Sequence, residues 1–335
     1  MRLHLNENTE GCSPAVIDTL RQLGRPEAGF YPDYEDARQA VAGNFGVPPE
    51  YVLLTNGLDE GILAACAAAF RDRSGGIPET LGVVPAFDMY EIFTTALGGH
   101  MVGVPCGPDF TSPLDHLRGA VTLRTRIVFL ANPHNPSGVP VPLDDLRALA
   151  RATAPATLFV DEAYADFSGD TLIDIATLDA MPSLLVGRTF SKAYGIAGLR
   201  VGAVIGHPST LAPLRQVVPP YSLNAWATAA LPVAIADRGY RDRYVAEAAE
   251  SRRMLASACQ RLGLQTWPSV ANFVLVRVGP RTPHVIDALA AQGIRVRDRS
   301  REPGCEWCVR ITAGITEDTR KVIAALEEAV CDARR

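Results

Sequence analysis

Short apolar runs alternate with longer amphipathic stretches through the middle of the chain. Six of these runs are rich in aliphatic residues: Leu81–Val84, Met101–Val104, Ile127–Ala131, Leu158–Val160, Leu184–Val186 and Val201–Ile205. Runs that are apolar at successive positions are typical of strands buried on both faces, as in a parallel sheet that helices cover on each side. The pattern therefore predicts an α/β fold, in which a mostly parallel, doubly wound sheet forms the middle of a three-layer α/β/α domain.

Helical patterns dominate the part of the chain before these runs. Ser13 and Pro14 are the residue types preferred at the N-cap and at the first helical position, so we predict a short helix over Ala15–Leu23. Apolar residues also recur with helical spacing over Tyr34–Phe45 and Leu58–Arg71.

The C-terminal part of the chain has a different pattern. Tyr240–Leu262 contains neither Gly nor Pro and predicts one helix of roughly 35 Å, long enough to connect two domains. Strand-like segments follow at Asn272–Val278, Ile294–Arg297 and Cys308–Thr312, before a closing helix from Thr316 to Ala329. We expect residues 1–28 to be an N-terminal segment that packs with a small α+β domain. Residues 29–238 would form the large domain, and residues 239–335 the connecting helix and the small domain.

Composition supports a globular protein and excludes several classes. The chain has 335 residues, of which 47% are hydrophobic and 21% are charged, so it is neither disordered nor fibrous. A net charge of −5 without a basic run argues against nucleic-acid binding. The longest strongly apolar stretches, Ile62–Phe70 and Ala229–Ala236, are too short to span a membrane. The first residues lack the apolar core of a signal peptide and the cysteine content is low, so we expect a cytoplasmic protein with reduced thiols.

Lysine is rare in this sequence. Only two of the 32 basic residues are lysines, Lys192 and Lys321. Because arginine supplies nearly all of the positive charge, a retained lysine indicates a position that needs an amine, since a guanidinium cannot form a Schiff base. Lys321 lies on a predicted solvated helix face, which leaves Lys192 as the candidate.

Polar clusters follow three consecutive strands of the predicted sheet. They are Asn132-Pro-His-Asn-Pro-Ser-Gly138, Asp161-Glu-Ala-Tyr164 and Gly187-Arg-Thr-Phe-Ser-Lys192. Each cluster lies about one strand–helix–strand unit from the next, so all three are expected at the edge where the parallel strands end. An amine, a carboxylate, an amide with a phenol, and hydroxyl and Arg donors together match the needs of pyridoxal phosphate.

These residues resemble the fold-type I pyridoxal-phosphate aminotransferases of class I/II, most of all the histidinol-phosphate aminotransferases. Matching segments occur in family order over almost the whole chain. Besides the three clusters they are Leu5-Asn-Glu-Asn8, Tyr31-Pro-Asp33, Asn56-Gly-Leu-Asp-Glu60, Pro85-Ala-Phe-Asp-Met-Tyr90, Pro219-Pro-Tyr221 and Val309-Arg-Ile-Thr312. The segment Arg188–Arg200, with Lys192 eight residues before Arg200, is strongly specific for the superfamily.

The resemblance implies a role for each matched residue. Lys192 would be the catalytic residue, which binds the cofactor aldehyde and moves the substrate proton. The implied cofactor contacts are Asp161 at the pyridine nitrogen, Asn135 and Tyr164 at the ring oxygen, Phe87 stacked on the ring, and Thr189, Ser191, Arg200, Leu58 and Asp59 at the phosphate. Tyr31 would reach the phosphate in the neighbouring subunit, which implies a homodimer. Arg310 would bind the substrate carboxylate, and Arg297 would join it on a phosphorylated substrate.

Several functions remain open at this point. The first is amino transfer between a small-molecule donor, glutamate, and a phosphorylated or aromatic acceptor. An aminotransferase of aromatic or specialised metabolism, a decarboxylase, lyase or oxidase with the same cofactor, and a non-catalytic cofactor-binding regulator are the alternatives. A nicotinamide dehydrogenase lacks its glycine motif. Ala86, Asp88 and Thr9-Glu-Gly-Cys12 depart from the family pattern on the expected substrate side.

No metal site is expected from the sequence. The six histidines lack the spacing of metal ligands, and the pair Cys305 and Cys308 is not accompanied by a second such pair.

Overall fold

The fold is organised around one large twisted sheet. The structure is a computed structural model that describes residues 1–332. Within these residues the large sheet has seven strands in the order β1-β7-β6-β5-β4-β2-β3. Their bounds are β1 (Val52–Asn56), β2 (Glu79–Val84), β3 (His100–Pro105), β4 (Thr125–Ala131), β5 (Thr157–Asp161), β6 (Leu184–Thr189) and β7 (Val201–Gly206). Only β7 runs antiparallel to its neighbours in this sheet.

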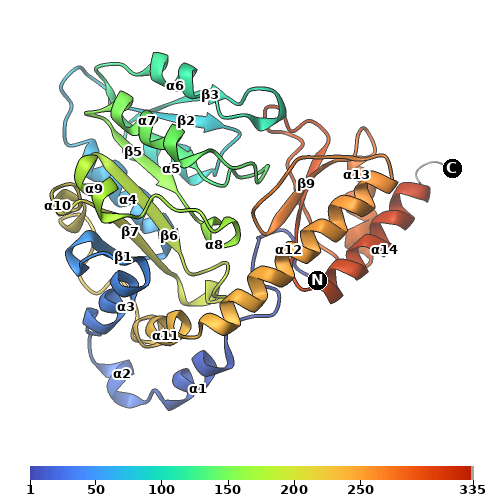
Figure 1. Cartoon of the computed structure of the whole chain (residues 1–335), viewed down its shortest axis with the longest axis horizontal. Coiled ribbons are helices and arrows are strands. Elements are labelled where there is room, and N and C mark those ends of the chain that lie inside the picture. The colour runs from blue at the N-terminus through green and yellow to red at the C-terminus, as the bar shows by residue number, and fades with distance from the viewer. Residues whose placement is uncertain (333–335) are drawn as a thin grey trace.

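Helices lie on both faces of the large sheet (Figure 1). They are α3 (Glu35–Phe45), α4 (Gly57–Ala69), α5 (Met89–Ala96), α6 (Leu114–Ala120), α7 (Leu143–Thr153), α8 (Ala165–Ser168), α9 (Ile175–Ala180), α10 (Pro208–Arg215) and α11 (Ala225–Ala236). Short 3₁₀ turns occupy Pro49–Tyr51, Pro108–Phe110 and Ala197–Leu199. The predicted three-layer α/β/α arrangement is therefore confirmed.

Alternate residues of the central strands belong to two separate hydrophobic clusters. Ile127 and Phe129 of β4 pack with α4, whereas Val128 and Leu130 of the same strand belong to the cluster on the opposite face. Both faces are apolar because both are covered, and this explains the uninterrupted apolar runs in the sequence. Full burial of each such side chain contributes roughly 1.5–3 kcal/mol.

A second, smaller sheet forms beside the first. Its strands β8 (Gln265–Thr266), β9 (Phe273–Arg277), β10 (Arg297–Asp298) and β11 (Cys308–Thr312) are antiparallel, in the order β10-β11-β9-β8. The helices α13 (Thr282–Ala291) and α14 (Thr316–Asp332) lie beside this small sheet (Figure 1).

The long helix α12 (Arg238–Arg261) connects the two regions. Tyr244 and Ala248, in its first half, belong to the hydrophobic cluster of the large sheet, whereas Leu255 and Cys259 belong to the cluster of the small sheet. Figure 1 shows the helix running from one region to the other. These contacts place α12 between the two hydrophobic clusters, and its role as a connection between two domains stays a prediction.

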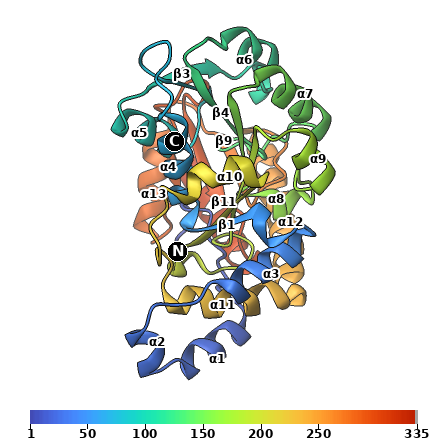
Figure 2. The same cartoon turned by 90° about the vertical axis from the view of Figure 1, so that its left-hand side faces the viewer.

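The N-terminal residues divide between the two regions. Leu3 is buried in the cluster of the small sheet, and its N–H donates to the carbonyl of Arg295. In contrast, α1 (Pro14–Gln22), capped by Ser13, packs against α11, and α2 (Arg25–Gly29) follows it at one end of the molecule (Figure 2). Leu3 therefore lies with the small sheet, while α1 lies with the large region. The boundaries at residues 28 and 238 stay predictions.

Two strands differ from the sequence-based expectation. The strand β1 was not expected, because Val52–Asn56 runs directly into α4 and offers only a short apolar run. The segment predicted as a strand over Ile294–Arg297 contributes only Arg297–Asp298 to β10. The backbone of Arg295 pairs instead with Met1 and Leu3.

Candidate active site

A cavity of about 430 Å³ lies where the large sheet meets the small one, and it contains nearly every predicted site residue. Those that line it are Leu58, Asp59, Phe87, Asn135, Asp161, Tyr164, Thr189, Ser191, Lys192, Arg200, Arg297 and Arg310. Only Tyr31 of the predicted set is not among the residues that line this cavity. Parallel strands that end at one edge of the sheet bring these groups together.

Asp161 lies at the centre of this edge. It is the last residue of β5 and stands in register between Ala131 and Gly187 of the neighbouring strands. Its carboxylate accepts hydrogen bonds from the Tyr90 hydroxyl at 2.6 Å and from the Ala163 N–H at 3.0 Å. Burial raises the pKa of Asp161. A buried carboxylate that faces a cavity suits a cationic group of a ligand, such as a protonated pyridine nitrogen.

Lys192 brings an amine into the same cavity from the loop after β6. Its Nζ donates to the carbonyl of Leu5 at 2.9 Å and lies 5.9 Å from the centre of the Tyr164 ring. No ion pair holds Lys192 among the described residues, so its amine is available to a ligand.

Another part of the cavity is lined by groups that can donate hydrogen bonds to an anion. Gly57 begins α4, and a Cβ at this position would lie 2.5 Å from Nη2 of Arg200. A Cβ at Gly202 would lie 2.5 Å from the backbone nitrogen of Leu58. These glycines therefore let Arg200 and the beginning of α4 approach each other closely. Together with the hydroxyls of Thr189 and Ser191, the arrangement fits a phosphate group.

Arg310 lies on β11 and is 6% exposed. Its Nη1 donates to Oδ1 of Asn135 at 2.5 Å and its Nη2 to the carbonyl of His4 at 3.0 Å. Burial lowers the pKa of Arg310 to about 10. No carboxylate forms an ion pair with it within residues 1–332, and its Nε has no hydrogen-bond partner there. A buried guanidinium without a carboxylate favours an anionic ligand in the cavity.

Two more arginines face the same part of the cavity. Arg297 lies 3.6 Å from a carboxylate oxygen of Asp88, and both side chains are substantially exposed. Arg299 was not predicted. It is buried, forms an ion pair with Glu302 and donates to the carbonyl of Ala86 at 3.3 Å. Arg299 lies two residues after Arg297, and in an extended chain this spacing points both side chains to the same side. That spacing is the signal that would have identified Arg299.

The N-terminal segment supplies residues that sequence reasoning missed. His4, Leu5 and Glu7 line the cavity. Asn6 is buried beside it, and its Nδ2 donates to the hydroxyl oxygen of Tyr164 at 2.9 Å. These contacts join the first residues of the chain to groups far along it, so no local pattern could show them.

Tyr31 lies apart from the cavity of its own chain. The residue is 78% exposed, and its ring stacks on that of Tyr221, with ring centroids 4.4 Å apart. Phe30 beside it is also largely exposed. Phe30, Tyr31 and Tyr221 together form an exposed aromatic surface.

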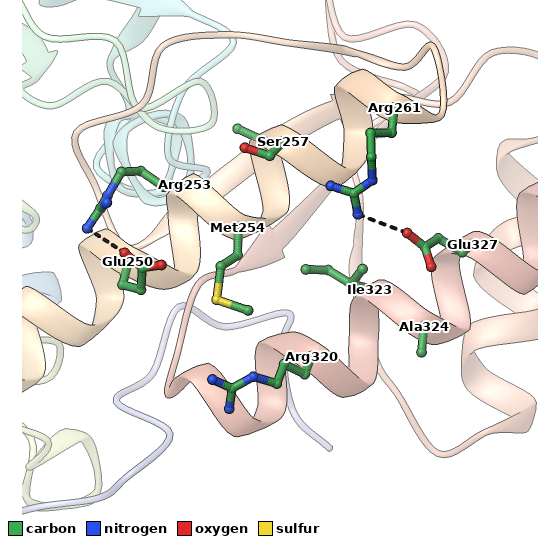
Figure 3. A pocket seen from close by; sticks show the side chains of 10 residues that line it. Glu250, Arg253, Met254, Ser257, Arg261, Arg320, Ile323, Ala324 and Glu327 are labelled. Carbon is green, nitrogen blue, oxygen red and sulfur yellow. Dashed lines mark hydrogen bonds and ion pairs between the residues drawn. The ribbon is translucent and has the colours of Figure 1, made fainter.

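A groove between α12 and α14 is a second concave region, shown in Figure 3. Met254 and Ile323 contribute apolar surface to it. At its rim Arg253 pairs with Glu250, and Arg261 pairs with Glu327. These charges are already balanced within the protein, in contrast to Arg310.

The cysteine pair offers no reactive group in this state. Cys305 and Cys308 are both buried, and burial raises the pKa of each thiol. A group of three or more His, Cys, Asp or Glu side chains able to hold a metal ion is not found within residues 1–332. In the same range no helix is both long and apolar enough to cross a membrane.

Comparison with known proteins identifies extensive similarity. The family model for aminotransferase class I and II matches residues 1–326. Histidinol-phosphate aminotransferase 2 of Ralstonia nicotianae is 36% identical, over 99% of this chain and 89% of the relative. Histidinol-phosphate aminotransferase of Symbiobacterium thermophilum is 34% identical, over 98% of this chain and 90% of the relative. The crystal structure of histidinol-phosphate aminotransferase from Sinorhizobium meliloti in complex with pyridoxal-5'-phosphate has a TM-score of 0.89 and 28% identity, over 99% of this chain and 91% of that chain.

Proposed function

This chain belongs to the class I and II aminotransferase family, and from this premise we propose that it moves an amino group between glutamate and the phosphorylated keto partner of histidinol phosphate. The cofactor is pyridoxal 5'-phosphate. The observation that supports an anionic substrate is the buried Arg310, which lines the cavity without a carboxylate partner within residues 1–332, and Arg297 beside it supports a phosphorylated one.

The cavity supplies each group that the cofactor needs. When bound, pyridoxal phosphate supplies an electron-withdrawing ring that stabilises negative charge on the substrate carbon. Lys192 is the proposed residue that holds the cofactor and carries the proton to and from that carbon. Asp161 keeps the pyridine nitrogen protonated, and Phe87 covers the ring.

Further contacts of the cofactor follow from the same arrangement. Asn135 and Tyr164 donate to the ring oxygen. The proposed phosphate contacts are Thr189, Ser191, Arg200 and the backbone at Leu58 and Asp59.

The arginines at the other side of the cavity select the substrate. Arg310 carries a planar guanidinium, whose N–H donors suit either a carboxylate or a phosphate. Arg297 adds a second positive charge, which a phosphate dianion uses better than a carboxylate does. Since histidinol phosphate has no α-carboxylate, its phosphate takes the place that the carboxylate of glutamate occupies.

One observation favours a second candidate. Asp88 lies 3.6 Å from Arg297 and balances part of its charge. This favours a substrate with a single negative charge, as in an aminotransferase of aromatic or specialised metabolism. The decarboxylase, lyase, oxidase and regulator alternatives share the cofactor contacts and receive no separate support from the cavity.

A substrate comparison tests the proposed function. The purified holoenzyme is mixed with histidinol phosphate or histidinol, and the conversion of 2-oxoglutarate to glutamate is measured. We expect histidinol phosphate to react with much the higher kcat/KM. Arg297→Ala should reduce this preference by about 1.5–3 kcal/mol, the loss of one charged hydrogen bond, and should affect glutamate less. Arg310→Lys should reduce kcat/KM for both substrates, because both lose the planar fork.

Two outcomes would contradict the choice of substrate. Equal reaction of histidinol and histidinol phosphate would show that the phosphate is not recognised. A decarboxylated or eliminated product would move the enzyme to another reaction with the same cofactor.

The assembly and the location of the protein are part of the proposal. Enzymes of this family act on small molecules and are typically dimeric. We propose a homodimer in which Tyr31 reaches the cofactor phosphate of the partner, supported by the exposure of its side chain and its absence from the lining of its own cavity. We also propose a cytoplasmic location, and a cofactor-binding domain that spans residues 29–238.

A further inference from the structure

The N-terminal segment places one buried amide against a residue of the proposed cofactor site. Asn6 is 1% exposed and has a φ of 55°, a left-handed conformation that Asn tolerates better than most residues. Its Nδ2 donates to the hydroxyl oxygen of Tyr164 at 2.9 Å. Its own N–H donates to Oγ1 of Thr312 at 3.1 Å, and its carbonyl accepts from Nδ2 of Asn272 at 3.1 Å. Both the backbone and the side chain of Asn6 are therefore held by hydrogen bonds.

We propose that Asn6 is a positioning residue that directs the hydroxyl hydrogen of Tyr164 toward the ring oxygen of pyridoxal phosphate. A phenol oxygen carries one hydrogen and accepts through its lone pairs. Because Nδ2 of Asn6 only donates, it uses an accepting site of that oxygen and leaves the hydrogen for a different acceptor. The inference rests on the proposed function, since it takes pyridoxal phosphate as the ligand of the cavity.

The contacts of Thr312 set the orientation of the Asn6 amide. The Thr312 hydroxyl accepts from the Asn6 N–H and donates its own hydrogen to Asn6 Oδ1 at 3.3 Å. If the amide were turned over, Nδ2 would face this hydroxyl, whose hydrogen would lose the acceptor that it has within residues 1–332. Both groups are buried, where water does not replace a lost hydrogen bond. The observed orientation, in which Asn6 donates to Tyr164, is thus favoured.

The path of hydrogen bonds also connects the two sides of the cavity. Thr312 lies on β11, the strand that carries Arg310. Thr312, Asn6 and Tyr164 therefore link the strand of the proposed substrate contact to the proposed cofactor contact. Asn135 would be the second donor to the ring oxygen, beside Tyr164. Arg310 donates to Oδ1 of Asn135, which leaves Nδ2 of Asn135 to donate to the cofactor.

Asn6→Asp tests the proposed direction of the hydrogen bond. It replaces a donor by an acceptor of the same size and retains a residue type that tolerates the left-handed conformation. The hydrogen of Tyr164 should turn to the new carboxylate. We expect the apoenzyme to bind pyridoxal phosphate about tenfold more weakly, as for the loss of one hydrogen bond. The pH at which the absorbance of the bound cofactor changes should rise, because the ring oxygen loses a donor.

Asn8→Asp is the matched control. Asn8 is buried in the same segment, and its Nδ2 donates to the carbonyl of Ala193 at 3.1 Å rather than to Tyr164. Asn8→Asp adds the same charge and loses the same kind of donor as Asn6→Asp. It therefore measures the effect of these two changes at a position that does not contact Tyr164. Thermal unfolding of the apoenzymes compares their folding. If Asn6→Asp does not fold, Asn6→Gly removes the donor and keeps the backbone conformation, with the same expected direction.

A double variant shows whether Asn6 acts through Tyr164. When Asn6→Asp is added to Tyr164→Phe, the affinity for pyridoxal phosphate should change by less than about twofold, because the phenol is already absent. Wild-type affinity in Asn6→Asp would overturn the inference, since it would mean that Asn6 already accepts from Tyr164. An equal loss with and without the phenol would overturn it as well. A wild-type apoenzyme that binds no pyridoxal phosphate would overturn the proposed function together with the inference.

Discussion

The burial of Asp161 lowers the stability of the apoprotein but supports the proposed reaction. Its carboxylate is buried under the cavity, and this burial raises its pKa. Burial therefore disfavours the ionised form of this carboxyl in the apoprotein, where the cation of the cofactor does not offset the cost. We predict that Asp161→Asn leaves the Tm of the apoprotein unchanged or raises it. Turnover by the holoenzyme should fall by at least about tenfold, or about 1.4 kcal/mol of barrier, because an amide does not hold the proton on the pyridine nitrogen.

Linkage gives the sign of the pH dependence for this variant. The folded-state pKa of Asp161 is raised above its unfolded value, so the wild-type carboxyl destabilises the fold progressively as pH rises above the unfolded pKa of about 3.9. Calorimetry of both apoproteins from about pH 4 to about pH 7 should show the variant gaining stability relative to the wild type. A variant that is clearly less stable at neutral pH would contradict the burial argument. A smaller loss of turnover would contradict the pairing with the cofactor.

The two lysines of the chain differ in their surroundings, so they can be compared directly as sites of cofactor attachment. Lys192 lines the cavity, whereas Lys321 is exposed on α14 and pairs with Glu317 at 2.7 Å. We predict that borohydride reduction of the holoenzyme attaches the cofactor to Lys192, as peptide mapping would show. Lys192→Ala should abolish this attachment and turnover, while Lys321→Ala should leave both unchanged. Cofactor found on Lys321, or on neither lysine, would be incompatible with the assignment.

At the scale of elements, the loop after β6 depends on contact with the N-terminal segment. Gly195 has a φ of 71°, and its N–H donates to the carbonyl of Lys192. A Cβ at this position would lie 1.9 Å from the carbonyl oxygen of Gly11. We predict that Gly195→Ala lowers the free energy of unfolding by about 2 kcal/mol or more and weakens cofactor binding, because the loop must move.

Gly198 is the control in the same loop. A Cβ there would meet nothing within 4 Å, so Gly198→Ala should change the free energy of unfolding by less than about 1 kcal/mol. Chemical denaturation of both variants measures the difference. Similar stability for Gly195→Ala and the wild type would show that the loop accommodates the side chain elsewhere.

The elements that could be predicted from sequence are those whose pattern is local. The apolar runs of β2 to β7 and the uninterrupted helix α12 were predicted because burial on both faces and the absence of Gly and Pro leave a direct trace in the sequence. The strand β1 and the true extent of β10 were not. Val52–Asn56 finds its partner in β7, and the segment before Arg297 finds its partner at the N-terminus, so their states depend on distant chain.

At the scale of the whole molecule, the proposed role of Tyr31 requires that each of two copies completes the site of the other. We predict that mixed dimers of Tyr31→Phe and Lys192→Ala chains regain activity that neither homodimer has in full. In such a dimer one site carries both changes and the other carries neither. Activity of the mixture is compared with that of each variant alone after exchange of subunits. If exchange is verified and no activity returns, Tyr31 serves its own chain.

The candidate site shows the same division between local and distant information. The cofactor side was located from sequence, because the parallel strands of one sheet deliver Asn135, Asp161 and Lys192 to one edge. The contribution of Asn6 and of Arg299 was missed, because each depends on how the small sheet and the N-terminal segment meet the large sheet. The roles of all these residues stay predictions.

The path of residues 1–9 has a consequence for the order in which the protein can be built. Asn6 leaves the ribosome 306 positions before Thr312, its partner. The large sheet can form earlier during synthesis, since domains generally fold as units. The segment that covers Lys192 must wait until β11 has emerged. A nascent chain stopped before that strand would present Lys192 and Asp161 at an open edge, so the enclosed site is a property that the chain acquires only after β11 has emerged.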